Sequence, residues 1–99
     1  MNLKQRKDLL EAEHIILTIC FILNISYYEL QNIQRKRKES EARFIVTYYL
    51  VKAGYMDCQI GGLLNRDRTT VLYYKKQVSN LLDTDPIFKE KLNIIGMQL

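Results

Sequence analysis

The chain has 99 residues, of which 47% are hydrophobic and 26% are charged, and its formal net charge is +4. This length suits one compact domain with a single core. Because the chain holds only four glycines and one proline, its composition favours helices and excludes a disordered protein. The positive charge favours a polyanionic partner such as nucleic acid.

An apolar first helix is predicted from Asp8 to Leu23, and Asn24 marks its end. Residues 15–23 are apolar except for Thr18, but this run is far shorter than the roughly 20 residues that a membrane span needs. Acidic residues precede the run, which excludes a signal peptide. We therefore expect a buried helix in a cytoplasmic protein with no membrane partner.

Two further helices are predicted on either side of a basic segment. Ser26 and Glu29 have the spacing of a capping box at the start of a short helix. The run 34–38 has no apolar residue, and its adjacent cations repel one another, which favours a loop. The next helix opens at Glu39 and ends at Gly54. Its core stripe has helical spacing and consists of Ala42, Ile45, Val46, Tyr49, Leu50 and Ala53.

The following segment predicts a helix-turn-helix. Asp57 is expected to cap a short helix that ends near Leu64. Asn65 tolerates the left-handed conformation of a tight turn. Asp67 is expected to cap a longer helix that continues to about Leu82.

A last helix is predicted from Pro86 to Ile95, since proline suits the first helical position. No segment of useful length alternates with the period of a strand. We therefore expect an all-α, Trp-repressor-like fold of five to six helices. We expect a single helical domain over residues 1–99, with the helix-turn-helix, an element typical of a DNA-binding domain, at about 57–82.

The front of the longer helix carries residue types that read DNA. Arg68 can bind guanine through two hydrogen bonds, and Thr69 and Thr70 can contact phosphate or a thymine methyl group. Tyr73 and Lys76 share a face with Thr69 and are expected near DNA. The rear face is apolar and consists of Val71, Tyr74 and Val78. The alternative is a structural helix corner with a solvated, charged turn.

Other cations offer contacts to DNA, and each has a plainer alternative. The basic run that contains Arg35 and Arg37 is either an arm for the minor groove or a solvated loop. Arg43 is placed on the polar face of its helix, where it either binds phosphate or pairs with Glu39. Lys75 and its neighbour either hold phosphate or are solvated.

No catalytic or metal-binding constellation stands out. The chain has one histidine, His14, and its two cysteines are far apart in the sequence. Cys20 and Cys58 are expected to be reduced thiols in the core. No phosphate-cradling glycine loop or nucleophile motif is present. We expect a protein that is not an enzyme and that binds no cofactor and no metal.

Residues 66–72, Arg-Asp-Arg-Thr-Thr-Val-Leu, resemble the Arg-Asp-His-Thr-Thr-Val-Leu signature of the C-terminal DNA-binding domain of the bacterial replication initiator DnaA. The similarity covers His14 to Ile95. Its further matching segments are the basic run 34–37, Arg43, Tyr49-Leu50 and Ile60-Gly61.

The resemblance implies a set of DNA contacts. By position, Arg37 enters the minor groove and Arg43 binds phosphate. Apart from the resemblance, the cations Arg35 and Arg66 offer further contacts to phosphate. The positions that the resemblance places in the major groove are Asp67, Arg68, Thr69 and Thr70. Arg68 stands where the family has histidine, and Asn65 stands where the family has glycine, so the preferred DNA sequence is expected to differ from the family's.

We therefore expect sequence-preferring binding of double-stranded DNA in replication or transcription control, by a bacterial or phage-derived protein. Since the chain has no nucleotide-binding loop, a stand-alone module is expected rather than an initiator. One alternative is a DNA-reading subunit or fragment of a transposase or integrase. Another is an adaptor whose apolar first helix docks a protein partner or a second copy to form a homodimer.

Overall fold

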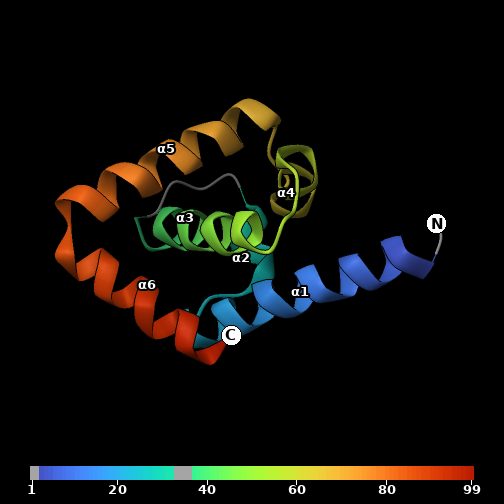
Figure 1. Cartoon of the computed structure of the whole chain (residues 1–99), viewed down its shortest axis with the longest axis horizontal. Coiled ribbons are helices and arrows are strands. Elements are labelled where there is room, and N and C mark those ends of the chain that lie inside the picture. Colours follow the sequence, from blue (N-terminus) through green and yellow to red (C-terminus); the bar gives the residue numbers. More distant parts are fainter. Residues whose placement is uncertain (1–2, 33–36) are drawn as a thin grey trace.

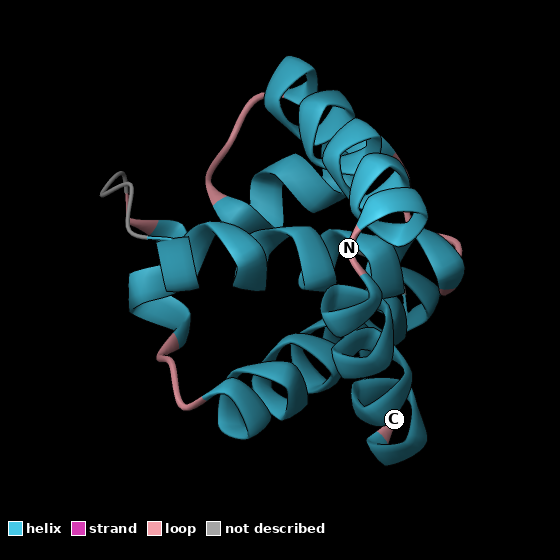
Figure 2. Cartoon of the chain, turned by 90° about the vertical axis from the view of Figure 1, so that its left-hand side faces the viewer, coloured by secondary structure: helices cyan, strands magenta, loops and turns pink. Residues whose placement is uncertain are grey.

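The protein has an all-α fold, and the computed structural model describes residues 3–32 and 37–99. The helices of that part are α1 (Leu3–Leu23), α2 (Tyr27–Gln31), α3 (Arg37–Lys52), α4 (Asp57–Leu64), α5 (Arg68–Thr84) and α6 (Pro86–Gln98). Short turns join α1 to α2 and join the successive helices from α3 to α6, and the described residues form no strand (Figure 1, Figure 2). None of these helices is long and apolar enough to cross a membrane. The prediction of an all-α fold with five to six helices is confirmed.

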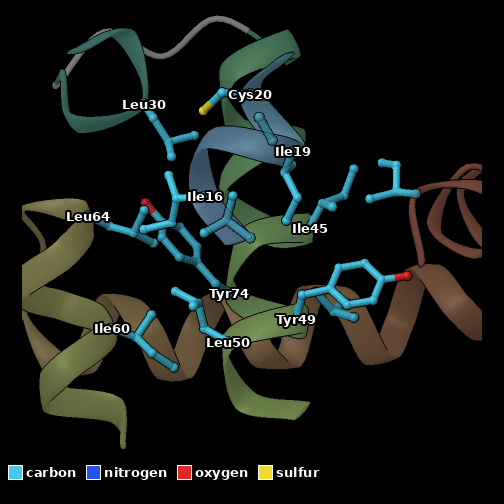
Figure 3. Packing of buried hydrophobic residues seen from close by; sticks show 14 of the residues in the cluster. Ile16, Ile19, Cys20, Leu30, Ile45, Tyr49, Leu50, Ile60, Leu64 and Tyr74 are labelled. Atoms are coloured by element: carbon cyan, nitrogen blue, oxygen red, sulfur yellow. The ribbon is translucent and has the colours of Figure 1, made fainter. Parts of the chain in front are cut away.

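Helix α3 lies at the centre of the bundle, where α1, α2, α4 and α5 pack against it (Figure 1). Its residues Ile45, Val46 and Leu50 are fully excluded from solvent, as the predicted stripe requires. Ile16 of α1 and Tyr74 of α5 complete this core (Figure 3). The core thus holds α5 through its rear face and leaves its front face toward solvent.

Side-chain caps explain where several helices begin. The Ser26 hydroxyl accepts a hydrogen bond from the Glu29 amide at 3.0 Å at the start of α2. The Asp85 carboxylate accepts from the Ile87 amide at 3.0 Å at the start of α6, where Pro86 is the first helical residue. Such caps satisfy amides that the first helical turn leaves without an internal partner.

Several helix boundaries differ from the predicted ones. Helix α1 begins at Leu3, because residues 3–7 contain good helix formers and no breaker. Helix α3 begins at Arg37, so the prediction that Arg37 and Lys38 lie in a loop is wrong. Repulsion between neighbouring cations is screened by water and salt, and one helical turn tolerates it. Ala53 is exposed because α3 has already ended before it.

The start of α4 also differs from the prediction. Met56, and not Asp57, is the capping residue, and its amide donates to the Gln59 side chain at 2.8 Å. Asp57 is the first helical residue, and it forms an ion pair with Lys75 of α5 at 3.1 Å. This pair ties the two helices of the helix-turn-helix together.

The two cysteines lie in different surroundings. Cys20 is buried, as predicted, and burial together with the charge of Glu29 raises its pKa to about 11. Cys58, which was predicted to be a core thiol, is exposed. The buried side of α4 is already made by Ile60, Gly61 and Leu64, and Cys58 lies away from it.

Candidate nucleic-acid interface

The turn between α4 and α5 is tight, and local contacts explain its path. Asn65 adopts the predicted left-handed conformation, with φ +56°. The amide of Arg66 donates to the carbonyl of Gly61 at 2.8 Å. A side chain at Gly61 would clash, because its Cβ would lie 2.6 Å from the Arg66 carbonyl oxygen. Asp67 then caps α5 by accepting from the Thr70 amide at 2.7 Å, as predicted.

Helix α5 has an exposed front and a buried rear. Arg68, Thr69 and Lys76 are exposed, and the side chain of Tyr73 is 54% exposed. The rear residues Val71, Tyr74 and Val78 are buried, which confirms the predicted orientation of the helix. The front therefore presents a guanidinium, a hydroxyl, an aromatic ring and an ammonium group on one accessible helix surface. We call Arg68, Thr69, Tyr73 and Lys76 the front face of α5.

Asp67 and Thr70 form the cap that starts the front face. Hydrogen bonds from the Thr70 backbone and side chain lower the pKa of the Asp67 carboxyl below its usual value. The carboxylate is therefore ionised near neutral pH and engaged with its own helix. Thr70 is only half exposed. Both residues shape the helix terminus, where the helix dipole favours anions.

Arg43 does not lie on the polar face of α3, and that prediction is wrong. Its side chain is 3% exposed, and Nε donates to the carbonyl of Leu30 at 2.7 Å. Nη2 donates to the carbonyls of Asn32 at 2.5 Å and Glu29 at 3.2 Å. These oxygens belong to the last turn of α2, where a helix lacks internal donors. Arg43 thus caps the C-terminus of α2 across the helix interface.

Arg66 joins the same cluster of carbonyl oxygens from the other side. Its Nη1 donates to the carbonyls of Gln31 at 3.1 Å and Asn65 at 2.9 Å, and its Nη2 donates to the carbonyl of Asn32. Burial, and then the nearby charge of Arg66, lower the pKa of Arg43. We call Arg43 and Arg66 the clamp arginines, because together they hold the end of α2 against α3 and the turn.

Two residues that sequence reasoning missed support this arrangement. The Tyr27 hydroxyl donates to the carbonyl of Leu63 at 2.7 Å, and the Gln31 amide donates to the same oxygen at 3.1 Å. Both residues lie on α2, and Leu63 lies in α4. Nothing in their local sequence signals these contacts, because the partners are more than thirty residues apart in the chain.

A polar cleft of about 640 Å³ lies beside the front face of α5, between α3 and α5. Ser40 and Thr70 contribute hydroxyl groups to its lining, and Tyr73 contributes its ring. The clamp arginines also line this cleft. Two guanidinium groups outnumber the one carboxylate of the lining, that of Asp67, so the cleft carries a net positive charge that suits an anionic group.

The basic segment 33–36, including Arg35, lies outside the described residues. Arg37 begins α3, and its side chain also lies outside the described part. Lys38 is exposed, and its Nζ donates to the carbonyl of Asn24 at 3.1 Å. The predicted minor-groove arm therefore stays a prediction.

The described residues contain no group of histidine, cysteine, aspartate and glutamate side chains that could hold a metal ion. Comparison with protein-family models finds no match, and comparison with curated proteins finds none. The described residues form six helices, and the second helix of the helix-turn-helix, α5, has an exposed front face.

Proposed function

We propose that this protein binds double-stranded DNA, with the N-terminal half of α5 in the major groove. The observation that carries the proposal is the front face of α5. It combines exposed groups that bind bases and phosphates with a rear face fixed in the core. An α-helix fits the major groove, and side chains near its N-terminus reach the base edges. The resemblance to the DnaA C-terminal domain supports the same placement.

The exposed residues receive distinct roles in this proposal. Arg68 binds guanine through its two-pronged guanidinium. Thr69 touches phosphate or a thymine methyl group, and Lys76 binds phosphate farther along the helix. Tyr73 packs on the DNA backbone between them. Asp67 and Thr70 cap the N-terminus of α5 and so stabilise its first turn.

The clamp arginines contribute to DNA binding by fixing the position of α5 and of the turn before it. Arg43 is bonded to backbone carbonyls, so we leave it out of the proposed phosphate contacts. Arg66 holds the turn against α2, which fixes the angle at which α5 leaves the bundle. Their charge also raises the potential of the adjacent cleft, where a backbone phosphate fits.

The proposal assigns the protein no reaction and no cofactor. It places the protein in the cytoplasm, as a bacterial or phage-derived module for replication or transcription control. Arg68, which stands where the DnaA signature has histidine, reads one base pair of the DNA site. A selected site is therefore expected to differ from a DnaA box at that base pair.

Fluorescence anisotropy with labelled duplexes tests the proposal. The wild-type chain and the Lys89→Ala variant should bind equally, since Lys89 is an exposed cation on α6. The Arg68→Ala variant loses the same charge and should bind the best site about 5- to 150-fold more weakly, as a lost base contact of about 1–3 kcal/mol requires. The best site comes from selection in a random duplex pool. Absence of duplex binding at low salt would overturn the proposal.

A further inference from the structure

Leu72 lies among the polar residues of the front face of α5, although its side chain is apolar. It is 45% exposed, and Tyr73 is the other large apolar side chain that α5 leaves exposed. Leu72 stands four positions after Arg68, three after Thr69 and four before Lys76. Residues three or four positions apart are neighbours on one side of a helix, so these exposed polar residues surround Leu72. The front face therefore has an apolar centre with a polar border.

Packing in the core does not account for Leu72. Tyr74 follows it by two positions, so the two side chains point about 200° apart around the helix. The Tyr74 ring lies inside the core, where Val71 and Val78 are also buried (Figure 3). Helix α5 packs its rear face against α3 and leaves Leu72 on the opposite side. A single exposed leucine is ordinary on a protein surface, but this one lies at the centre of the surface proposed to enter the major groove.

The chemistry of the major groove offers one partner for an aliphatic side chain. Leucine has no group that hydrogen-bonds to a phosphate or to the polar edge of a base. The apolar group that each T·A pair presents in the major groove is the C5-methyl group of thymine. Arg68 and Lys76 flank Leu72 by one helical turn on either side, and their charges attract the DNA. An α5 held in this way brings Leu72 onto the base edges.

We propose that Leu72 reads a thymine by packing on its C5-methyl group, as a specificity-determining residue of the DNA site. The inference rests on the proposed function, since it requires the front face to lie in the major groove. Arg68 and Leu72 are four positions apart, which is about 6 Å along the helix axis. Stacked base pairs are about 3.4 Å apart. The thymine therefore lies within about two base pairs of the guanine that Arg68 binds.

Replacing single thymines by deoxyuridine in the best selected duplex tests this contact. Deoxyuridine lacks the methyl group but keeps every hydrogen-bonding group of the base pair. The guanine is located as the base pair at which Arg68→Ala relaxes the sequence preference. For the wild-type chain, one replacement within about two base pairs of it should weaken binding about 4-fold, the factor expected for one buried methyl-sized group.

Variants of Leu72 decide whether this side chain makes the contact. Leu72→Ala should bind the thymine and uracil duplexes equally, with unchanged circular dichroism, because Leu72 lies outside the core. Leu72→Gln keeps the length of the side chain but ends in a polar amide, and it should also lose the discrimination. Ile94→Ala is the matched control, since Ile94 is an aliphatic side chain on α6 that is 50% exposed. It should discriminate between thymine and uracil as the wild type does.

Two results would overturn the role of Leu72 and leave DNA binding in place. One is a wild-type chain that binds the thymine and uracil duplexes equally at every position near the guanine. The other is a discrimination that survives in Leu72→Ala and disappears in Thr69→Ala, which would assign the thymine to the methyl group of Thr69. A wild-type chain that binds no duplex would instead overturn the proposed function, and the role of Leu72 with it.

Discussion

Replacing Arg43 by alanine is expected to destabilise the fold strongly, because its guanidinium is buried and bonded to backbone carbonyls. It donates to the oxygens of Leu30, Asn32 and Glu29. A hydrogen bond to a charged group contributes about 1.5–3 kcal/mol. Arg66 also donates to Asn32, so that oxygen keeps a partner in the variant. The bonds to Leu30 and Glu29 are lost. At about 1.5 kcal/mol each, their loss should lower the free energy of unfolding by about 3 kcal/mol.

A loss of this size is measurable in urea and thermal unfolding followed by circular dichroism. For a domain of this length it corresponds to a fall in Tm of about 12–24 °C. Arg43→Lys keeps the charge but lacks the planar fork that reaches several oxygens at once. Its free energy of unfolding should lie between those of the wild type and Arg43→Ala.

Arg68→Ala is the matched control for this experiment, since Arg68 is an exposed arginine on α5. Its free energy of unfolding should stay within about 0.5 kcal/mol of the wild-type value. If Arg43→Ala unfolds at the same urea concentration as Arg68→Ala, the reasoning about the clamp is refuted. Arg43 would then be available as a phosphate ligand, as the sequence resemblance implies.

Three further outcomes are expected. The logarithm of the duplex affinity should fall with the logarithm of salt concentration at a slope of about −3.6 if about four phosphates are contacted, and a slope near zero would contradict electrostatic binding. Gly61→Ala should lower Tm, because its Cβ would lie 2.6 Å from a backbone oxygen, whereas Gly62→Ala has open space and should stabilise α4 by up to about 1 kcal/mol. Equal shifts in the Tm of the two variants would show that the turn moves to accommodate the added methyl group. At pH 8, Cys58 should react quickly with a thiol reagent and Cys20 only on unfolding, because Cys20 is buried with a pKa of about 11. Equal reaction rates for Cys20 and Cys58 in the folded protein would contradict the burial of Cys20.

Much of the helical framework follows from short-range sequence signals. The caps at Ser26 and Asp67 bond to amides three residues ahead. Asn65 turns the chain because its side chain tolerates the left-handed conformation. The stripe of α3 predicts its buried face from residue spacing alone. These features depend on neighbours within about one helical turn, so the sequence by itself determines them.

The front face of α5 could also be predicted from sequence. Val71, Tyr74 and Val78 recur with helical spacing, and their burial leaves Thr69 and Tyr73 on the opposite side. What the sequence could not decide was which cations remain free for DNA. Arg43 is next to the stripe of α3, and its own helix does not reveal that α2 covers it.

The tertiary structure decided the roles of the clamp arginines. Arg43 and Arg66 donate to carbonyls at the end of α2, and these contacts span 11 to 35 positions of the chain. The last carbonyls of any helix need donors from elsewhere, but the sequence does not say which donors will reach them. That choice depends on how α2, α3 and the turn pack together. The same reason explains why Asp57 pairs with Lys75, because only the packed fold brings the two charges within 3.1 Å.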